Sequence, residues 1–198
     1  MRTILGELMQ LGRYGFTVIR YARGTTLGIP SGLTENEGSE LATIAAGKDV
    51  LEIGSWYGYS TIRMARTASA VVAVDWHRGD EHAGYGGSLM IFWRNLVKHG
   101  AADRTLPFIG RTVDALPRLA DHQFDLVFID GLHTYDAVRS DVELSLPKLK
   151  PGGTLAFHDY GRPDFGVTQA VDELVAKTSA SIRVVDSLAV LKLTTSTH

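Results

Sequence analysis

Short apolar runs alternate with amphipathic stretches along most of the chain. The runs hold too few polar residues for period-two alternation, which is typical of strands buried on both faces. They span residues 49–54, 70–75, 105–110, 124–130 and 153–159, and the stretches that follow them predict helices over 60–67, 88–99, 113–119, 135–149 and 167–177. This βα repeat predicts a mostly parallel sheet with right-handed crossovers.

A further helix is predicted ahead of the repeat, over residues 31–47. Thr34 or Asn36 is suited to be its N-cap, and acidic residues fill the first turn, where the helix dipole favours negative charge. One face of this helix is apolar and carries Leu41, Ile44 and Ala45. That face should pack on the sheet.

The carboxyl-terminal part predicts a different strand direction. Residues 151–153, Pro-Gly-Gly, are expected to break the chain between a helix and a strand. Residues 181–186 and 187–194 read as two strands that turn at Asp186-Ser187. The expected fold class is therefore α/β: a doubly wound, mostly parallel, seven-stranded sheet with an antiparallel edge strand and helices on both faces.

Length and composition limit the function classes. A chain of 198 residues accommodates one domain, here expected as an N-terminal helical cap segment over 1–33 and a main domain over 34–198. The net charge of -2 gives no electrostatic footprint for nucleic acid. The chain has no cysteine, which excludes disulfides and thiolate metal sites and fits a cytoplasmic location.

The N-terminal segment is apolar but not a membrane span. Arg2, Glu7, Arg13 and Arg20 interrupt it too often for a transmembrane helix or a signal-peptide core. A helix that covers the sheet is expected, and contact with a membrane surface or with a second subunit is the alternative. The segment is compatible with a homodimer.

The segment VLEIGSWYGYS, which begins at Val50, predicts a ligand site after the first buried strand. Gly54 and Gly58 bracket a tight turn into a helix, where backbone without side chains can approach a ligand. The segment departs from the dinucleotide pattern G-x-G-x-x-G, because Ser55, Trp56 and Tyr57 fill the space that a pyrophosphate needs. A nucleoside without phosphates fits better.

Two carboxylates belong to this predicted nucleoside site. Asp75 ends the second strand, about 20 residues past the glycine turn, from where a carboxylate accepts both ribose hydroxyls in such folds. A helix N-cap is the alternative role for Asp75. Glu52 lies inside an apolar strand, and a buried carboxylate needs a partner. That partner is either the cationic end of a bound ligand or an arginine.

A second candidate site has oxygen and nitrogen donors. Asp130 and Asp159 each end a predicted strand, and neighbouring strands lie about 4.8 Å apart, so both carboxylates can converge on one divalent cation. A loop N-cap and a turn bond are their alternative roles. His158 is a further metal ligand unless it points to the opposite face of its strand. His133 lies within reach of a hydroxyl held by the metal, although a surface role is the alternative.

The chain resembles catechol O-methyltransferase and its bacterial relatives over about residues 34–177. The resemblance is carried by VLEIGSWYGYSTIRMA, FIGRTVDALPRL and the long segment that starts at FDLVFIDGLHTY. The patterns D-G-x-H-x-Y and P-G-G-x-x-x-x-H-D are closer to the bacterial branch that acts on sugars and other small natural-product hydroxyls. The resemblance implies a Rossmann-like class I methyltransferase domain that uses S-adenosyl-L-methionine.

The resemblance also assigns roles to individual residues. Asp75 would bind the ribose, and Arg111, Thr112 and Val113 would border the adenine. Glu52, Gly54, Ser55 and Tyr57 would line the methionine part of the cofactor, and Ser60, Trp76 and Asp130 complete the expected cofactor-binding set.

For the acceptor half, the resemblance implies a magnesium-like ion bound by Asp130 and Asp159. The catechol enzyme has Asn after its second Asp, where this chain has Tyr160, and a His158 ligand would favour a softer ion than Mg2+. His133 takes the position of the catalytic lysine. With an ordinary pKa of about 6.5, an imidazole is the better base at neutral pH.

The expected function is therefore divalent-metal-assisted O-methylation of a small-molecule hydroxyl. The alternatives are a metal-dependent hydrolase or hydroxylase that uses the same cluster, and a non-catalytic nucleoside-binding protein. The polar, glycine-rich loop 76–87 is expected to close over substrate or to be a solvated loop, with a second metal site as a remote alternative. Tyr160 and Phe165 are candidates for the wall of the acceptor pocket or for the core.

Overall fold

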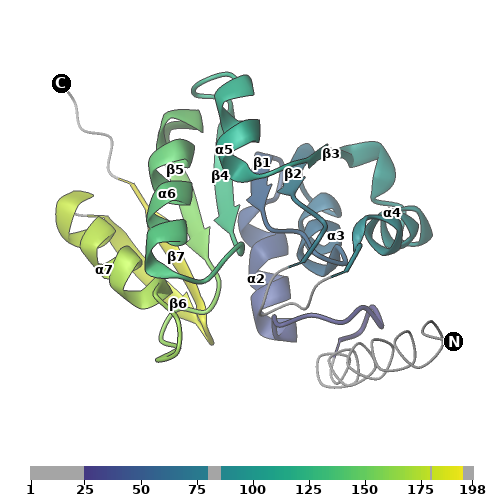
Figure 1. The fold of residues 1–198 in the computed structure, drawn as a ribbon, viewed down its shortest axis with the longest axis horizontal. Coiled ribbons are helices and arrows are strands. Elements are labelled where there is room, and N and C mark those ends of the chain that lie inside the picture. Colours follow the sequence, from purple (N-terminus) through teal and green to yellow (C-terminus); the bar gives the residue numbers. More distant parts are fainter. Residues whose placement is uncertain (1–24, 80–85, 179, 194–198) are drawn as a thin grey trace, which may run out of the picture.

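The computed structural model describes residues 25–79, 86–178 and 180–193. Within them, seven strands form one sheet in the order β3-β2-β1-β4-β5-β7-β6 (Figure 1). The strands are β1 (Asp49–Ile53), β2 (Ala70–Asp75), β3 (Thr105–Ile109), β4 (Phe124–Ile129), β5 (Leu149–Phe157), β6 (Ser181–Val185) and β7 (Leu188–Lys192). Strands β1 to β5 pair in parallel, and β7 runs antiparallel to both β5 and β6. The predicted sheet is confirmed.

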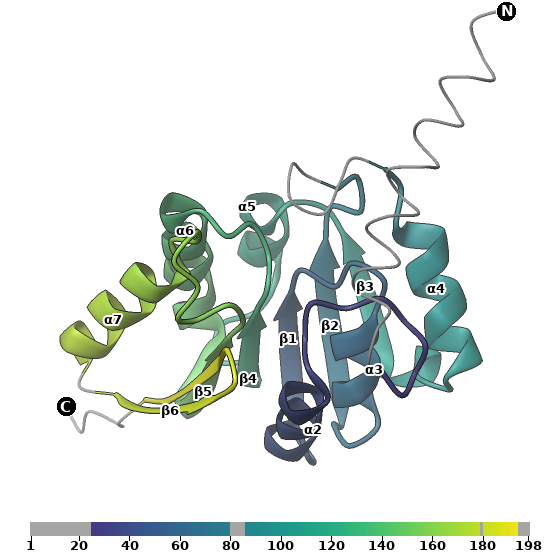
Figure 2. The ribbon, with the colours of Figure 1, turned by 90° about the horizontal axis from the view of Figure 1, so that it is seen from below.

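Helices cover both faces of this sheet. They are α2 (Glu35–Ile44), α3 (Tyr59–Ala65), α4 (Leu89–Lys98), α5 (Thr112–Ala115), α6 (Tyr135–Ser145) and α7 (Val167–Thr178). Figure 2 shows α5, α6 and α7 on one side of the sheet and α2 and α3 on the other. Successive side chains of a strand point to opposite faces, so Val50 joins the core under α2–α4 and Leu51 joins the core under α5–α7. The uninterrupted apolar runs in the sequence follow from this double burial.

Helix α2 begins directly after Thr34, one of the two residues predicted to cap it. The Thr34 side chain accepts a hydrogen bond from the backbone N–H of Glu37, and the Glu37 side chain accepts from the backbone N–H of Thr34. This capping box satisfies two N–H groups at the helix start. The helix therefore begins at Glu35 rather than at residue 31, and Leu41 and Ala45 on its predicted apolar face are fully buried.

The predicted break at Pro151-Gly152-Gly153 is wrong in its position. Strand β5 already begins at Leu149 and runs through these residues, with a shift of its pairing register to β4 between Phe124 and Leu126. Gly152 has a φ of 71°, a left-handed conformation that glycine adopts without strain. Glycine at this position therefore lets β5 continue to pair with β4 beyond the bulge. Helix α6 ends at Ser145 in a short 3₁₀ turn, Leu146–Lys148, so it is shorter than predicted.

Part of the sequence-based prediction lies outside the described residues. The cap segment over 1–33 is described only from residue 25 and the loop 76–87 only in part, so the division into 1–33 and 34–198 stays a prediction. In the described part of the chain, no helix is both long enough and apolar enough to span a membrane.

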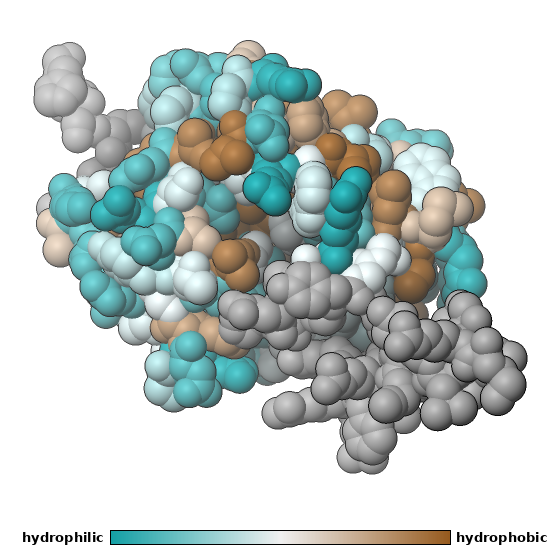
Figure 3. All heavy atoms as spheres, viewed as in Figure 1, coloured by the Kyte–Doolittle hydropathy of each residue, from teal (hydrophilic) through white to brown (hydrophobic). Residues whose placement is uncertain are grey.

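Apolar side chains reach the surface at the right of Figure 3. On α4, the side chains of Met90, Trp93 and Val97 are exposed.

The turn after β1 generates a prediction about stability. Gly54 has a φ of 86°, and a Cβ there would lie 2.1 Å from the carbonyl oxygen of Asp130. Gly47 also has a positive φ, of 69°, but nothing lies within 4 Å of its would-be Cβ. Gly47→Ala should cost about 1–2 kcal/mol for the backbone conformation alone, whereas Gly54→Ala adds about 1–3 kcal/mol of steric overlap.

Urea denaturation of both variants measures this difference in the free energy of unfolding. Equal losses in the two variants would contradict the close approach of Gly54 to Asp130.

Candidate functional site

The predicted site residues gather at the carboxyl ends of the parallel strands β1 to β5, which lie side by side in the sheet. In open α/β sheets ligands bind at this edge. Three non-glycine residues just past these strand ends have positive φ angles: Trp56 (41°), His77 (53°) and Asp159 (61°). Strained backbone of this kind persists only where the surroundings enforce it, and it clusters at functional sites.

Asp75 organises the glycine turn. One oxygen, Oδ2, accepts from the backbone N–H groups of Ser55 at 2.8 Å and Trp56 at 2.7 Å. The other, Oδ1, accepts from the backbone N–H of His77 at 2.6 Å. The Ser55 hydroxyl adds a long contact of 3.5 Å to Oδ2. Oδ1 has one N–H donor, so one of its two acceptor positions is left for a ligand hydroxyl. Asp75 thus caps a turn rather than a helix, and its predicted ribose role remains compatible with its contacts.

Glu52 is fully buried, and its partners are hydroxyl groups. It accepts a hydrogen bond from Ser60 and another, at 2.5 Å, from Thr61. Burial raises the pKa of Glu52 to about 8, and these two hydrogen bonds only partly oppose the effect. Glu52 and Ser60, both predicted to bind the cofactor, thereby fasten α3 to β1 directly behind the glycine turn. Among the described residues no arginine pairs with Glu52, which was the alternative to a ligand.

The residues predicted to surround the nucleoside lie around the ends of β2 and β3. Trp76 is 38% exposed, and the guanidinium groups of Arg78 and Arg111 lie 4.6 and 5.0 Å from the centre of its ring. Arg111 is the N-cap of α5, which begins at Thr112, and Val113 is exposed. An accessible indole beside helix N–H groups is suited to an aromatic base.

Tyr57 lies apart from this exposed group of residues. It is buried and stacks on Trp56 at 4.2 Å, and its carbonyl accepts from the Asn95 side chain at 2.8 Å. Ser55, predicted beside it, is also buried. These two residues support the turn from the inside.

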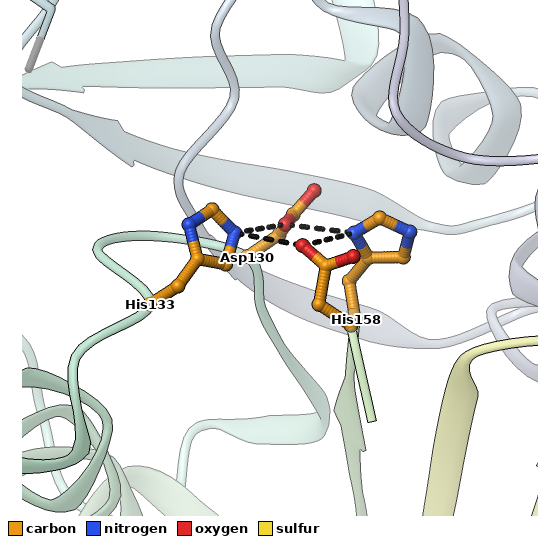
Figure 4. Close-up of side chains that lie close together, drawn as sticks. Asp130, His133 and His158 are labelled. Carbon is orange, nitrogen blue, oxygen red and sulfur yellow. Dashed lines mark hydrogen bonds and ion pairs between the residues drawn. The ribbon is translucent and has the colours of Figure 1, made fainter. Parts of the chain in front are cut away.

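The candidate metal centre lies one strand away, at the ends of β4 and β5. Asp130, His133, His158 and Asp159 each offer one ligand atom, and these atoms lie within 4.8 Å of one another. Nε2 of His133 is 3.0 Å from Oδ2 of Asp159 and 3.5 Å from Oδ1 of Asp130. Nδ1 of His158 is 3.2 Å from Oδ1 of Asp130 and 3.3 Å from Oδ2 of Asp159. Figure 4 shows the two imidazoles facing Asp130 from opposite sides.

His158 points into this cluster and not to the opposite face of the sheet. Its backbone N–H still donates to the carbonyl of Ile129, but strand β5 ends at Phe157 and Asp159 has a left-handed φ. The alternation of side chains stops where the strand stops. Neighbouring residues can therefore both face the cluster.

The two carboxylates and two imidazoles control each other's protonation. Burial would raise the pKa of Asp130 and Asp159, yet the two histidines hold both values below the usual range. Burial would lower the pKa of His133, but Asp130 and Asp159 raise it to about 9. The same two aspartates, together with Glu37, raise the pKa of His158. The imidazoles thus stabilise the charged form of the two aspartates, a role that a divalent cation could take over.

These four residues fit a divalent cation. Two carboxylate oxygens and two imidazole nitrogens converge from two strand ends and one loop, and carboxylate and imidazole are common ligands of divalent metals. Phe165 stacks on His133 at 4.6 Å and so borders the centre. Tyr160 instead donates its hydroxyl to Asp172 on α7, which places it between core and surface.

Two buried acids near the site were not predicted. Glu37 on α2 is fully buried, and its Oε2 lies 3.5 Å from Nε2 of His158. Asp141 on α6 is buried behind Gly131, and burial raises its pKa to about 6. In the sequence, Glu37 reads only as part of a helix cap, and Asp141 reads as one polar residue of an amphipathic helix. An acidic residue beside Val138 and Val142, on the apolar face of the predicted helix, is the signal that could have found Asp141.

The close approach of Gly54 joins the two halves of the site. The backbone of the glycine turn lies against the carbonyl of Asp130, and the Asp130 N–H donates to the carbonyl of Ile53 at 2.8 Å. A candidate nucleoside site and a candidate metal centre in contact at adjacent strand ends are the arrangement that the resemblance to class I methyltransferases implies. A family model described as a methyltransferase domain matches residues 51–160.

The chain belongs to this methyltransferase-domain family. The class inferred from the resemblance, class I S-adenosylmethionine-dependent methyltransferases, is confirmed.

Relatives of known sequence agree with this family. The chain is 40% identical over 94 residues to a catechol O-methyltransferase of Mycobacterium tuberculosis, a match that covers 46% of this chain and 39% of the relative. It is 34% identical over 136 residues to the uncharacterized protein y4gI of Sinorhizobium fredii, covering 64% of this chain and 15% of the relative. The chain therefore spans less than half the length of either relative.

A solved structure shares the fold. The O-methyltransferase TomG of Streptomyces achromogenes, in complex with SAM, is 22% identical, with a TM-score of 0.63 over 90% of this chain and 89% of that chain.

Glu52 generates a prediction about pH. Its pKa is about 8 in the folded state against 4.5 for a free carboxyl, so between these values the folded state keeps a proton that the unfolded state has released. The free energy of unfolding should therefore fall as the pH rises from about 5 to 8. The fall is on the order of 3–5 kcal/mol for this group.

Glu52→Gln removes the ionisation and should flatten the fall. Denaturant unfolding at several pH values measures it, with Glu143→Gln as the control at an exposed glutamate (67%). A Glu52→Gln protein with the same pH dependence as the wild type would refute the assignment.

Proposed function

We propose that this chain is an S-adenosylmethionine-dependent O-methyltransferase that acts on a hydroxyl of a small molecule, such as a sugar or natural product, with the help of a divalent cation. The observation that carries the proposal is the convergence of Asp130, His133, His158 and Asp159 within 4.8 Å, in direct contact with the glycine turn after β1. Relatives named as a catechol O-methyltransferase and as an O-methyltransferase in complex with SAM support it.

The predicted cofactor residues divide between recognition and support. Asp75 offers its remaining acceptor capacity to the ribose, and Trp76 with Arg111, Thr112 and Val113 borders the base. Gly54, Ser55, Tyr57 and Asp130 shape the turn beside the methionine part, while Glu52 and Ser60 hold that turn in place from behind. S-adenosylmethionine supplies an electrophilic methyl group, and the acceptor oxygen gains a C–O bond as the C–S bond breaks.

Asp130 and Asp159 are proposed to hold the cation, with His158 as a further ligand and His133 as the base. A bound divalent cation makes a coordinated hydroxyl more acidic. His133 can accept a proton only in its neutral form, and its pKa of about 9 reflects the two carboxylates it now neutralises. A divalent cation bound to Asp130 and Asp159 would neutralise those carboxylates in place of His133. The pKa of His133 would then fall towards the range of a base at neutral pH.

Each of the two rival functions explains only one of the two candidate sites. A hydrolase or hydroxylase would use the four-residue cluster but would leave the glycine turn and Asp75 without a role. A nucleoside-binding protein would use the turn but would not need the cluster. The homodimer and the cytoplasmic location stay predictions.

Isothermal titration of the purified chain with S-adenosylmethionine, with and without a divalent metal ion, tests the proposal. Binding should be measurable in both cases, and S-adenosylhomocysteine should form only with a hydroxylated acceptor and should increase when metal is present. A screen of sugars and phenols supplies the acceptor. Failure to bind the nucleoside would overturn the proposal, whereas binding with no metal effect on turnover would remove the cation from it.

His133→Ala should bind S-adenosylmethionine with wild-type affinity, because the imidazole touches the metal centre and not the glycine turn. Transfer should slow by about 10²–10⁴-fold through loss of the base. The control is turnover of His122→Asn. His122 lies just before β4, at the opposite edge of the sheet. Its φ is 53°, a conformation that asparagine tolerates. Full activity in His133→Ala would show that another group takes the proton.

A further inference from the structure

The imidazole of His158 is held from both sides. Its Nδ1 faces Asp130 and Asp159 at 3.2 and 3.3 Å, and its Nε2 faces Oε2 of Glu37 at 3.5 Å. Only 4% of its side chain is exposed. A Cβ on Gly32 would lie 3.4 Å from Cε1 of the ring, so the segment before α2 covers the remaining edge. The ring has little freedom to turn.

Glu37 is itself fixed by four contacts. Oε1 accepts from both the backbone N–H and the hydroxyl of Ser187, each at 2.7 Å. Oε2 accepts from the backbone N–H of Thr34 at 2.7 Å and lies beside His158. The carboxylate has no exposed surface. It is not among the four residues whose ligand atoms converge at the candidate metal centre. It therefore acts on the centre through His158.

A neutral imidazole has one N–H and one lone pair, and the partner of the N–H decides which nitrogen can bind a metal. A carboxylate behind a ligand histidine accepts that N–H, fixes the ring orientation and strengthens the ligand. In a neutral His158, Glu37 at Nε2 would keep the N–H on that nitrogen and leave the lone pair on Nδ1, which is the atom directed at the two aspartates.

We propose that Glu37 is a positioning residue that directs Nδ1 of His158 at the space between Asp130 and Asp159, and that the centre therefore prefers a first-row transition metal ion to Mg2+. The inference rests on the divalent-cation site of the proposed function, although it does not depend on methyl transfer. Mg2+ favours all-oxygen ligands in octahedral geometry, whereas imidazole suits later first-row ions such as Fe2+, Co2+ and Zn2+ better.

The test is the ratio of Co2+ to Mg2+ affinity of the metal-depleted full chain, measured by titration without S-adenosylmethionine. His158→Asn removes the imidazole, and Glu37→Gln removes the carboxylate behind it. Each should weaken Co2+ binding by about 10–100-fold and change Mg2+ binding by less than about threefold. The visible absorption of bound Co2+ reports its ligands, and it should change in both variants.

Ser187→Ala is the matched control. It removes a hydroxyl that donates to Glu37 but leaves the contact between Glu37 and His158, so it should lower stability without altering the Co2+ to Mg2+ ratio or the Co2+ spectrum. Circular dichroism checks the fold of each variant. If Glu37→Gln does not fold, Glu37→Asp, which keeps the charge on a shorter side chain, takes its place with the same expected direction.

The outcomes separate this inference from the proposed function. An unchanged ratio in His158→Asn overturns nitrogen ligation, and an unchanged ratio in the Glu37 variant overturns the positioning role. A chain that binds S-adenosylmethionine but neither metal overturns the whole inference. A chain that binds Co2+ as expected but does not bind S-adenosylmethionine overturns the proposed function and leaves the metal centre.

Discussion

Two carboxylates fixed at the ends of hydrogen-bonded strands are the constraint on which the rest of the site depends. Ile129 pairs with Phe157 in the β4–β5 ladder, and the residues that follow include Asp130 and Asp159. Neighbouring strands lie about 4.8 Å apart, so the backbone positions that carry the two carboxylates stay close as long as the sheet is intact. Positive charge has to come to them, and His133 from the loop before α6 and His158 from the end of β5 supply it.

The nucleoside side of the molecule is tied to the same carboxylates by sterics rather than by charge. The turn after β1 lies so close to the Asp130 carbonyl that only glycine fits at position 54. The carboxylate of Asp75 then fixes the next two backbone N–H groups. The candidate cofactor site and the candidate metal centre therefore share one backbone segment, which suits a reaction whose rate depends on how two bound groups are aligned.

The sequence predicts most of the sheet and the pair of aspartates, because double burial leaves uninterrupted apolar runs and strand ends meet at one edge. It does not predict where β5 begins, since the bulge at Gly152 depends on pairing with β4. The direction of His158 depends on the backbone conformation of the next residue. The contact of Glu37 with His158 depends on how α2 packs against the rest of the chain. Such contacts leave no periodic signal.

The hairpin between β6 and β7 reaches back to the start of α2. Its turn residue Asp186 accepts from the Thr34 hydroxyl at 2.6 Å, and Ser187 donates to Glu37 across 150 positions of sequence. During synthesis the chain emerges from its N-terminal side, so α2 and both aspartates leave the ribosome before this turn does. The anchoring of Glu37 is thus completed only by some of the last described residues to be made, and a nascent chain can pair strands β1 to β5 before the candidate metal centre has its final shape.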